Sequence, residues 1–371
     1  MRKTWILSEI PSSYRVDFFN LLEKFYGNRL TIAFMPTGRE LYKSLIHASP
    51  DEPFNKISRY YDHPSPTRRA LSLMADIIRD KPDIIISNGF PLRSLPLVAY
   101  AQLTNTELYS WLGETDLSAT SRGKARKIFR KTLSRFFDGG VLYSEFSRTY
   151  LDSLNDKPFK NLVLGNNTRD SRHYIRNLHT QNLQADHDTI QFITVGFQSP
   201  RKNSGTIIRA FHTLRQKTQK AELTIVGDGE SLDELKKLHK ELGTDGVHFT
   251  GKVKPDELIE VYGKSDVLVH SALIDQWPQT HNEAAAAGLA ILISNTSGVW
   301  DSYMKQYAND VSFGPNDDDR LAELMLKVVD SPDYLMELKQ AAQASAFNHD
   351  ATQCIKDWID FFEPEYSESV K

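Results

Sequence analysis

Cysteine is almost absent from this sequence of 371 residues, because Cys354 is its only cysteine. A single cysteine cannot form an internal disulfide or a cysteine-based metal site, which suits a cytoplasmic, reducing environment. Long apolar runs are missing too. The longest run of small apolar residues, 284–293, is about half of the roughly 20 residues that a membrane-spanning helix needs. The apolar stretch at 5–7 ends at Ser8 and Glu9, so we expect no signal peptide.

Acidic and basic side chains nearly balance over the whole chain, since the formal net charge is -3. That total hides an asymmetry between the two halves of the chain. Residues 1–180 hold 27 basic and 18 acidic side chains, a net charge of +9, whereas residues 181–371 hold 18 and 30, a net charge of -12. The length predicts about two domains, and their opposite charges indicate that they face different partners.

What the sequence does contain is an alternation of short, β-rich apolar runs with longer amphipathic stretches, which is typical of parallel sheets with crossover helices. The predicted strands of the first half are 4–10, 30–35, 83–87, 107–112, 140–144 and 161–164. Those of the second half are 190–195, 222–226, 247–249, 267–269 and 290–293. We therefore expect an α/β fold made of two doubly wound, Rossmann-like domains that face each other across a cleft.

A polar segment without periodicity, 170–188, predicts a linker between these domains. The expected domains are 1–180 and 181–350, followed by a C-terminal segment, 351–371. One face of its helix carries Trp358, Phe361 and Phe362. Because such an apolar face must be covered, we expect this helix to pack back toward the first domain.

The most informative stretch is DQWPQTHNEAAAAG at 275–288, which lies between two predicted strands. It contains Asp275 and Glu283, and we expect Glu283 in the first turn of a helix that begins near Asn282. The free N–H groups of a first turn can receive an anion, and carboxylates beside them can bind ribose or sugar hydroxyls. In the alternative interpretation, Glu283 only complements the helix dipole and Asp275 only belongs to a turn.

This stretch resembles a motif of the retaining glycosyltransferases with the GT-B fold, known as group 1 or family four. Their motif places Asp or Glu eight positions before a second Glu, with seven residues between them, and the residues that match it in register are Asp275, Trp277, Asn282, Glu283, Ala284, Gly288 and Ser294. The segments 195–211, 224–238, 247–253 and 265–272 are similar to other landmarks of the family. In the first half, 8–24, 82–89, 138–151 and 164–170 resemble it more weakly.

The resemblance implies a metal-independent enzyme that moves a sugar from a UDP- or GDP-linked donor to a saccharide or polyprenyl-linked acceptor. Surface polysaccharide or lipopolysaccharide synthesis is the implied setting, with no resident cofactor and no nucleic-acid partner. Residues 317–319, all aspartate, are expected to cap a helix rather than to hold a metal. Two alternatives stay open, namely a sugar-nucleotide epimerase of the same architecture and a non-catalytic sugar-nucleotide-binding protein.

For the donor, the resemblance implies that Lys202, assisted by Arg201, holds the diphosphate. It places Glu283 on the ribose and Asp275 near the hydroxyls of the donor sugar. The other implied donor-binding residues are Gly196, Trp277, Gln279, Thr280 and Asn282. The sequence departs from the family at Phe197, where relatives have a phosphate-binding arginine, and at Pro278, a position that is often glycine.

On the acceptor side, Glu114 follows a predicted strand and lies nearest to the position at which relatives have a histidine that contacts the donor sugar. We therefore include Glu114 among the expected catalytic residues, together with Asp275, Glu283 and Lys202. The expected acceptor-side residues are Ser12, Ser13, Arg15, Glu114 and Asp116. An exposed acidic turn is the alternative interpretation of Glu114 and Asp116.

The segment RGKARKIFRKTLSR at 122–135 contains seven basic side chains and no acidic one. Interspersed apolar residues make it a basic amphipathic helix, which can lie on an anionic membrane surface. The residues expected to face the inner side of such a membrane are Arg122, Lys124, Arg126, Lys127, Arg130 and Lys131. A solvated basic face packed on its own sheet is the alternative.

Overall fold

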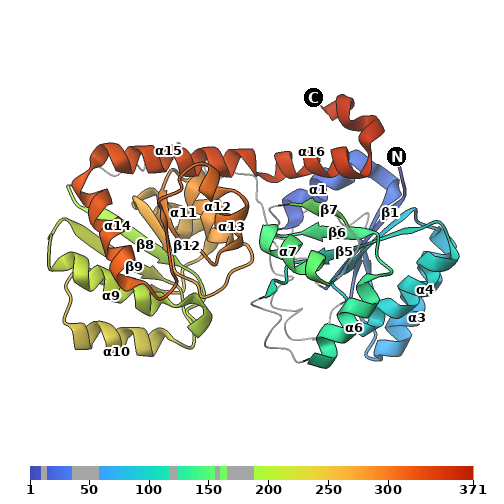
Figure 1. Cartoon of the computed structure of the whole chain (residues 1–371), viewed down its shortest axis with the longest axis horizontal. Helices are drawn as coiled ribbons and strands as arrows, with labels where there is room; N and C mark the ends of the chain where they lie inside the picture. The colour runs from blue at the N-terminus through green and yellow to red at the C-terminus, as the bar shows by residue number, and fades with distance from the viewer. Residues whose placement is uncertain (10–14, 36–57, 117–123, 155–158, 165–187, 371) are drawn as a thin grey trace. The chain divides into compact units, whose positions relative to one another are not determined.

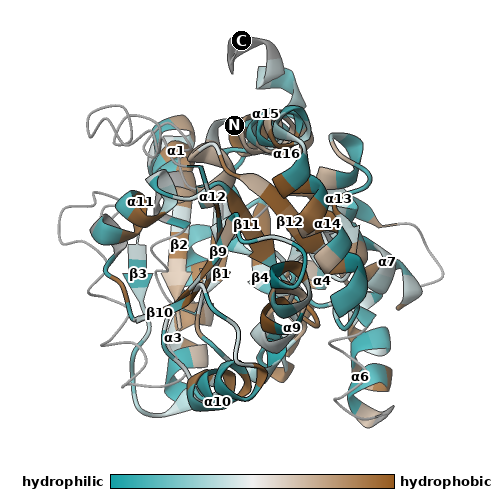
Figure 2. Ribbon diagram, turned by 90° about the vertical axis from the view of Figure 1, so that its left-hand side faces the viewer, coloured by the Kyte–Doolittle hydropathy of each residue, from teal (hydrophilic) through white to brown (hydrophobic). Residues whose placement is uncertain are grey.

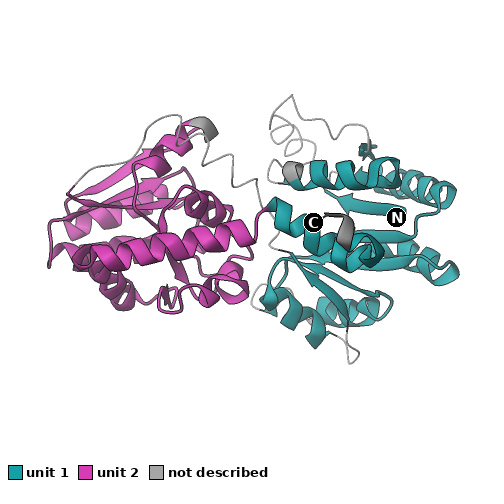
Figure 3. Cartoon of the chain, turned by 90° about the horizontal axis from the view of Figure 1, so that it is seen from above, with its two compact units in different colours: residues 1–169, 351–371 teal, residues 170–350 magenta. Residues whose placement is uncertain are grey.

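The structure is a computed structural model, and it describes residues 1–9, 15–35, 58–116, 124–154, 159–164 and 188–370. The chain divides into two compact units. Unit 1 comprises residues 1–169 and 351–371, and unit 2 comprises residues 170–350 (Figure 3). Each unit contains one sheet, and the strand pairs that the structure describes are all parallel. The predicted linker at 170–188 and the boundary at residue 180 fall almost wholly outside the described residues.

Unit 1 has a sheet of seven strands in the order β3-β2-β1-β4-β5-β6-β7. The strands are β1 (Thr4–Ser8), β2 (Leu30–Phe34), β3 (Ser58–Tyr60), β4 (Ile84–Asn88), β5 (Glu107–Leu112), β6 (Gly139–Leu142) and β7 (Lys160–Val163). Strands β1, β2 and β4 to β6 are almost entirely buried, as expected for parallel strands that helices cover on both faces.

Two helical layers cover this sheet (Figure 1). One apolar core joins the sheet to α1 (Val16–Tyr26) and α16 (Ala351–Phe362). The other joins it to α3 (Pro66–Asp80), α4 (Leu95–Leu103), α6 (Lys124–Ser134) and α7 (Glu145–Ser153). The last long helix of the chain thus belongs to the core of unit 1. Within it, the fully buried Trp358 donates a hydrogen bond from Nε1 to the hydroxyl of Tyr26 at 3.1 Å.

Unit 2 has a six-stranded sheet in the order β10-β9-β8-β11-β12-β13. The strands are β8 (Ile190–Val195), β9 (Ala221–Val226), β10 (Val247–Gly251), β11 (Val267–His270), β12 (Ala290–Ser294) and β13 (Ser312–Phe313). The helices are α9 (Ser204–Arg215), α10 (Leu232–Leu242), α11 (Pro255–Gly263), α12 (Gln279–Ala286), α13 (Gly298–Ser302), α14 (Asp318–Asp330) and α15 (Pro332–Asn348). Helix α9 contacts α10 and α14, whereas α12 and α15 pack together against β12.

Figure 2 shows the usual separation of side chains, with hydrophobic residues along strands such as β12 and mostly hydrophilic residues on α10. In the part of the chain that the structure describes, no helix has both the length and the apolar content to cross a bilayer. Helix α14 begins as predicted from the three aspartates, since Asp317 accepts a hydrogen bond from the N–H of Arg320 at 3.0 Å.

The strand order reverses at one point in each sheet. In unit 1 the reversal lies between β1 and β4, and in unit 2 it lies between β8 and β11. The connections that leave these neighbouring strands run to opposite faces, so a crevice opens outside their carboxyl ends. Ligands of doubly wound sheets bind in this crevice. The topology therefore marks one candidate position in each unit.

Candidate active site

The candidate site in unit 2 lies where β8 and β11 end. Gly196 follows β8, and the chain then forms a short 3-10 helix, η6 (Pro200–Lys202). Strand β11 ends at His270, and the loop 271–278 leads into α12. The structure therefore brings the predicted residues of 196–202 and 275–283 to the same edge of one sheet.

Asp275 is the centre of a charged cluster at this edge. Its Oδ2 atom accepts a hydrogen bond from Lys202 Nζ at 2.7 Å and one from Arg201 Nη1 at 3.2 Å. His270 Nε2 lies 3.6 Å from the same oxygen, too far for a hydrogen bond. Asp275 is 9% exposed, while the side chain of Arg201 is 52% exposed. The cations thus line the outer side of a buried carboxylate.

The pKa values fix the charge of this cluster. Burial raises the pKa of Asp275. The attraction of Lys202, with smaller contributions from His270 and Arg201, outweighs this effect and brings the pKa below its usual value. Burial lowers the pKa of His270 to about 3, and nearby Lys202 acts in the same direction. At neutral pH the carboxylate is therefore ionised and His270 is uncharged. With the two cations, the cluster carries a net charge of about +1.

The loop that carries Asp275 is held on both sides by backbone atoms. On one side, Leu273 N–H donates to the carbonyl of Arg201 at 2.9 Å, and Ser271 Oγ donates to that of Lys202 at 3.1 Å. On the other side, the N–H of Gly298 donates to the carbonyl of Asp275 at 2.8 Å. These bonds fix the loop between η6 and the start of α13, so Asp275 and Lys202 are preorganised.

Helix α12 begins earlier than the sequence predicts. It starts at Gln279 rather than near Asn282, so Glu283 lies in the second turn and not in the first. The prediction was wrong because Pro278, at the N-cap, fits the helix start without any capping side chain to mark it. The first-turn N–H groups of Gln279 and Thr280 have no side-chain cap, whereas that of His281 donates to the carbonyl of Pro278 at 3.2 Å. Glu283 accepts a hydrogen bond from the hydroxyl of Tyr262 at 3.1 Å.

Several side chains around the start of α12 bury polar atoms that have no hydrogen-bond partner among the described residues. They are Trp277 Nε1, Gln279 Oε1 and Nε2, Thr280 Oγ1, His281 Nδ1, Asn282 Nδ2 and Ser297 Oγ. A buried polar atom without a partner costs roughly 1–3 kcal/mol, so such a concentration is unusual for a site that serves only folding. Four of these side chains are the predicted donor-binding residues Trp277, Gln279, Thr280 and Asn282.

Trp277 occupies a different environment from its neighbours. Only 4% of the residue is exposed, and its ring packs edge to face on Tyr303, with ring centroids 5.1 Å apart. The Trp277 ring therefore anchors the loop 271–278 by packing against Tyr303. A stacking platform for a ligand would require an exposed face.

The loop after β8 contains an organising residue that the sequence analysis missed. Gln198 donates from Nε2 to the carbonyls of Gly196 at 3.1 Å and Val226 at 3.0 Å, and it accepts from Ser204 Oγ at 2.7 Å. A Cβ atom at Gly229 would lie 2.3 Å from the carbonyl oxygen of Gln198. Only glycine therefore allows the loops after β8 and β9 to pack so closely. The neighbouring Phe197 is 64% exposed.

In unit 1, Arg15 lies at the carboxyl end of β1. Its guanidinium stacks on the ring of Trp111, 4.9 Å from the centroid, and donates hydrogen bonds to Ser8 Oγ at 3.4 Å and to the hydroxyl of Tyr143. Asp116 is exposed. Ser12 and Ser13, which were also predicted on the acceptor side, lie outside the described residues.

The structure corrects the prediction for Arg130. This residue is 8% exposed and forms an ion pair with Glu114 and a hydrogen bond to Tyr150 at 3.1 Å, so it cannot lie on a membrane. The prediction was wrong because the helix turns this basic position toward its own sheet. Arg126, Lys127 and Lys131 are exposed as predicted. Arg122 lies outside the described residues, and Lys124 begins α6.

The buried histidines near the site predict a pH dependence of stability. Burial lowers the pKa of His270 and of His281 to about 3, against about 6.5 in the unfolded chain. Between pH 7.5 and 5.5 the unfolded state therefore binds protons that the folded state does not. Stability should fall by about 1.4 kcal/mol for each histidine, or about 3 kcal/mol for the pair.

Urea unfolding at the two pH values measures this loss. Burial also lowers the pKa of His349 to about 4, so a third histidine contributes about as much. His281→Gln should therefore remove about a third of the pH-dependent part. Equal free energies of unfolding at pH 7.5 and 5.5 would show that these side chains are not buried in the neutral form.

With this geometry established, comparison with known proteins identifies the domain. Residues 176–345 match the model of the family described as "Glycosyl transferases group 1". The chain therefore carries a group 1 glycosyltransferase domain. The resemblance noted at 275–294 lies within the matched residues, and the family assignment made from that motif is confirmed.

Individual relatives match this chain over parts of their length. An uncharacterised glycosyltransferase of Methanocaldococcus jannaschii is 25% identical over 222 residues, which cover 56% of each chain. A GDP-mannose-dependent alpha-(1-6)-phosphatidylinositol monomannoside mannosyltransferase of Mycobacterium tuberculosis is 30% identical over 138 residues, 34% of this chain and 36% of that one. The chain thus aligns with about half or less of the length of these relatives.

Solved structures resemble this chain over nearly its whole length. A crystal structure of Anabaena HepE in complex with UDP has a TM-score of 0.75 and 16% identity, covering 98% of this chain and 100% of that one. WaaG, a glycosyltransferase involved in lipopolysaccharide biosynthesis, has a TM-score of 0.60 and 14% identity, covering 97% and 100%. At such identities the likeness concerns the fold. It confirms the predicted α/β fold of GT-B type.

Proposed function

We propose that the protein is a retaining glycosyltransferase that uses a nucleotide-diphosphate sugar as donor and a saccharide or lipid-linked acceptor. The observation that carries this proposal is the meeting of two features at the switch point of unit 2. One is the cluster of Lys202, Arg201 and Asp275, with its net positive charge. The other is the uncapped start of α12, with its buried and unpartnered polar atoms.

In the proposed complex, the diphosphate binds to Lys202 and Arg201 and to the first-turn N–H groups of α12. Negative charge accumulates on this group as the bond to the sugar breaks, and fixed cations and a helix N-terminus stabilise that charge. Lys202 already lies in place through its bond to Asp275. The same charges give the leaving group its stabilisation without a metal ion, so we propose a metal-independent reaction.

In this proposal the carboxylates of Glu283 and Asp275 bind different parts of the donor. Glu283, held by Tyr262, accepts hydrogen bonds from the ribose. Asp275 stays ionised and orients the donor sugar through its hydroxyls. The acceptor hydroxyl attacks the anomeric carbon from the face that the leaving group departs, and its proton passes to the donor phosphate. This scheme needs no nucleophile from the enzyme.

Glu114 is assigned a positioning role. Its carboxylate forms an ion pair with Arg130, whose side chain is itself only 10% exposed. A carboxylate committed to a partly buried partner is poorly suited to contact a sugar. We propose that this pair holds α6 to the end of β5 and so shapes the acceptor side of unit 1.

The proposed reaction is tested by incubating the protein with UDP- and GDP-linked sugars, first without and then with a panel of saccharide and lipid acceptors. A glycosyltransferase consumes the donor rapidly only when an acceptor is present. An epimerase converts the donor sugar without any acceptor. Tight binding of nucleotide with no turnover under either condition would instead identify a non-catalytic binding protein.

We also propose that α6 attaches the enzyme to the cytoplasmic face of an anionic membrane. Arg126, Lys127 and Lys131 are exposed there, and Ile128 is 67% exposed. Exposed basic and apolar side chains on one helix are the combination that binds to anionic lipid surfaces.

Replacement of Arg126, Lys127 and Lys131 by glutamine is expected to weaken binding to vesicles rich in phosphatidylglycerol by about 100-fold, because each basic side chain contributes about 1 kcal/mol at such a surface. Sedimentation with vesicles measures this change. A matched control replaces three exposed lysines of α10, Lys236, Lys237 and Lys240, by glutamine and should bind like the wild type. Equal binding by the α6 variant would contradict the proposal.

A further inference from the structure

Three side chains of unit 2 form a row of contacting rings that begins in the loop 271–278. The ring of Trp277 packs edge to face on Tyr303, with centroids 5.1 Å apart and an angle of 81° between the planes. Tyr303 in turn packs on His349, with centroids 3.4 Å apart and an angle of 33°. This aromatic row therefore links a residue two positions after Asp275 to two residues that the proposed donor complex does not contain.

The middle ring of the row is fixed by the short helix α13. Tyr303 caps the end of this helix, and its N–H donates to the carbonyl of Val299 at 3.0 Å. At the start of the helix, the N–H of Gly298 donates to the carbonyl of Asp275 at 2.8 Å. Helix α13 thus contacts the loop 271–278 through its backbone at one end and through the Tyr303 ring at the other.

The last ring of the row belongs to the end of α15. His349 caps this helix, and its N–H donates to the carbonyl of Ala346 at 3.4 Å. Burial lowers the pKa of His349 to about 4, so its ring packs in the uncharged form at neutral pH. Asp350 is the last residue of unit 2, and the next helix, α16, belongs to unit 1. The aromatic row therefore extends from the donor loop to the segment at which the chain leaves unit 2.

A second set of contacts holds the position of His349. The ring of Tyr307 lies nearly perpendicular to it, with centroids 6.5 Å apart. The hydroxyl of Tyr307 accepts a hydrogen bond from Asn348 Nδ2 at 2.8 Å. The segment that carries Tyr303 and Tyr307 is thereby attached to the end of α15 by two ring contacts and a hydrogen bond.

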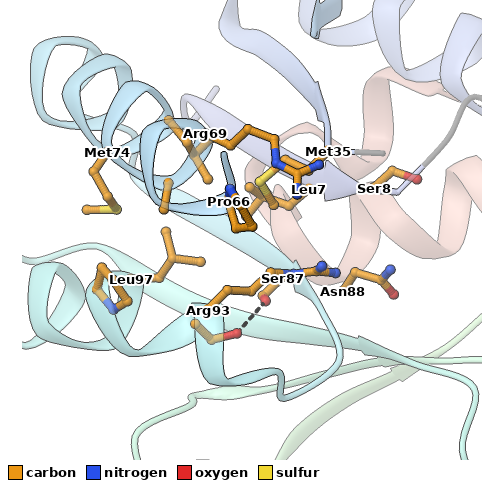
Figure 4. Close-up of a pocket in the computed structure, with 14 residues that line it drawn as sticks. Leu7, Ser8, Met35, Pro66, Arg69, Met74, Ser87, Asn88, Arg93 and Leu97 are labelled. Carbon is orange, nitrogen blue, oxygen red and sulfur yellow. Dashed lines mark hydrogen bonds between the residues drawn. The ribbon is translucent and has the colours of Figure 1, made fainter. Parts of the chain in front are cut away.

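The switch-point edge of unit 1 is built differently. A cavity of about 320 Å³ lies there, lined by Leu7 and Ser8 at the end of β1 and by Ser87 and Asn88 at the end of β4 (Figure 4). Among the described residues that line this cavity there is no aromatic side chain and no histidine. Rings packed against a switch-point loop are thus a feature of unit 2 and not a general requirement of doubly wound sheets.

The row acts on the part of the loop that carries the chemistry. Trp277 is only 4% exposed, and it lies between Asp275 and Pro278, the N-cap of α12. A displaced indole would therefore move both the carboxylate and the start of the helix. A loop that is not held in the free protein must be ordered by the ligand, and this ordering weakens binding.

We propose that Tyr303 and His349 are positioning residues for the donor site and that they act through Trp277. This inference rests on the proposed glycosyltransferase function, to which it adds two residues that do not touch the donor. In the free protein the row holds the loop 271–278 in its binding geometry. Without the row, only a fraction of the molecules has the loop in place, and the apparent affinity for the donor falls by that fraction.

Calorimetric titration of the full chain with UDP and GDP tests the proposal. Tyr303→Leu removes two ring contacts and should weaken binding of the nucleotide diphosphate at least tenfold, whereas His349→Ala removes one contact of Tyr303 and should weaken it at least threefold. In transfer assays the KM for the donor should rise by the same factors. We expect kcat to change less than twofold, because saturating donor orders the loop.

This pattern separates positioning from a purely structural role. A variant that is partly unfolded has a lower binding stoichiometry and a lower kcat, but its folded fraction keeps the wild-type affinity and KM. Tyr303→Phe and His349→Phe keep a ring at each position and should bind the nucleotide within twofold of the wild type. The matched control is Tyr334→Leu, which removes a ring at the opposite end of α15 and should leave the affinity unchanged.

A double substitution tests whether the row acts through Trp277. In a Trp277→Leu background, Tyr303→Leu should cause no further loss of affinity, because the contact that transmits its effect is already absent. An equal loss in both backgrounds would show that Tyr303 acts by another route and would overturn this part of the proposal.

Wild-type affinity in both Tyr303→Leu and His349→Ala, or an equal loss in Tyr303→Phe, would overturn the proposal as a whole. If Tyr303→Leu does not fold, His349→Ala decides the question alone. If the wild type binds a nucleotide diphosphate and these variants bind it equally well, only the positioning inference is wrong. If the wild type binds neither UDP nor GDP, the glycosyltransferase assignment fails, and the inference that rests on it fails too.

Discussion

Lys202→Ala is expected to lower kcat for sugar transfer by about 100- to 1,000-fold. Lys202 Nζ is the cation nearest to Asp275, and in the proposed complex it neutralises the diphosphate as its charge grows. Loss of one preorganised group that stabilises such charge usually costs this much in kcat. The fold should survive, because Arg201 still pairs with Asp275 after the substitution. Steady-state transfer kinetics with saturating donor measure the effect.

A structural role for Lys202 can be separated from this catalytic role. If Lys202 serves only to hold Asp275, Lys202→Ala should have little further effect in an Asp275→Asn background. A direct contact with the diphosphate predicts a large drop in kcat in both backgrounds. The control is Lys237→Ala on α10, whose side chain is 77% exposed and whose loss should leave transfer unchanged. Turnover of Lys202→Ala at the wild-type rate would contradict the assignment.

Glu283→Ala is expected to abolish measurable transfer by removing the proposed ribose contact. Hydrogen bonds to a carboxylate contribute roughly 1.5–3 kcal/mol each, so two ribose bonds correspond to a weakening of donor binding by more than 100-fold. The substitution also leaves the buried hydroxyl of Tyr262 without this acceptor. Calorimetry with the nucleotide diphosphate measures the lost affinity directly, and transfer assays measure the lost rate.

Tyr262→Phe separates the effect of orienting the Glu283 carboxylate from the effect of removing it. It keeps Glu283 but removes the hydrogen bond that orients it, so we expect a higher KM for the donor with a smaller change in kcat. A matched control exists in the same unit, where the hydroxyl of Tyr334 donates to Asp310 at 3.0 Å. Tyr334→Phe breaks an equivalent bond away from the site and should leave KM unchanged. Wild-type donor affinity in Glu283→Ala would refute the ribose assignment.

The sequence predicted most strands because parallel strands that helices cover on both faces are continuous apolar runs. It missed β3 and β13, which have only three and two residues, too few for any pattern. Helix α4 would be equally hard to predict, because its sequence LPLVAYAQL is apolar on nearly every side and shows no helical period. Strand β13 is the reason why the sheet of unit 2 has six strands where the sequence predicted five.

The residues of the candidate site could be named from the sequence, but their partners could not. The resemblance to a family motif singled out Asp275 and Glu283, and the structure brings both to the same edge of the sheet in unit 2. The bond between Lys202 and Asp275 joins positions 73 residues apart, and it exists only because β8 and β11 are neighbours in the sheet. The pairing of Arg130 with Glu114 likewise depends on how α6 rotates onto its sheet. Such contacts follow from topology, which local patterns do not specify.

Calorimetric titration of the wild-type protein with UDP, GDP and their free nucleosides tests the central claim most directly. The claim is that the cluster of Lys202 and Arg201, together with the start of α12, forms a site for a nucleotide diphosphate. It predicts that one of the two diphosphates binds at least 100-fold more tightly than its nucleoside, and that Lys202→Ala removes most of this difference. Equal binding of diphosphate and nucleoside, or no binding of either diphosphate, would contradict it.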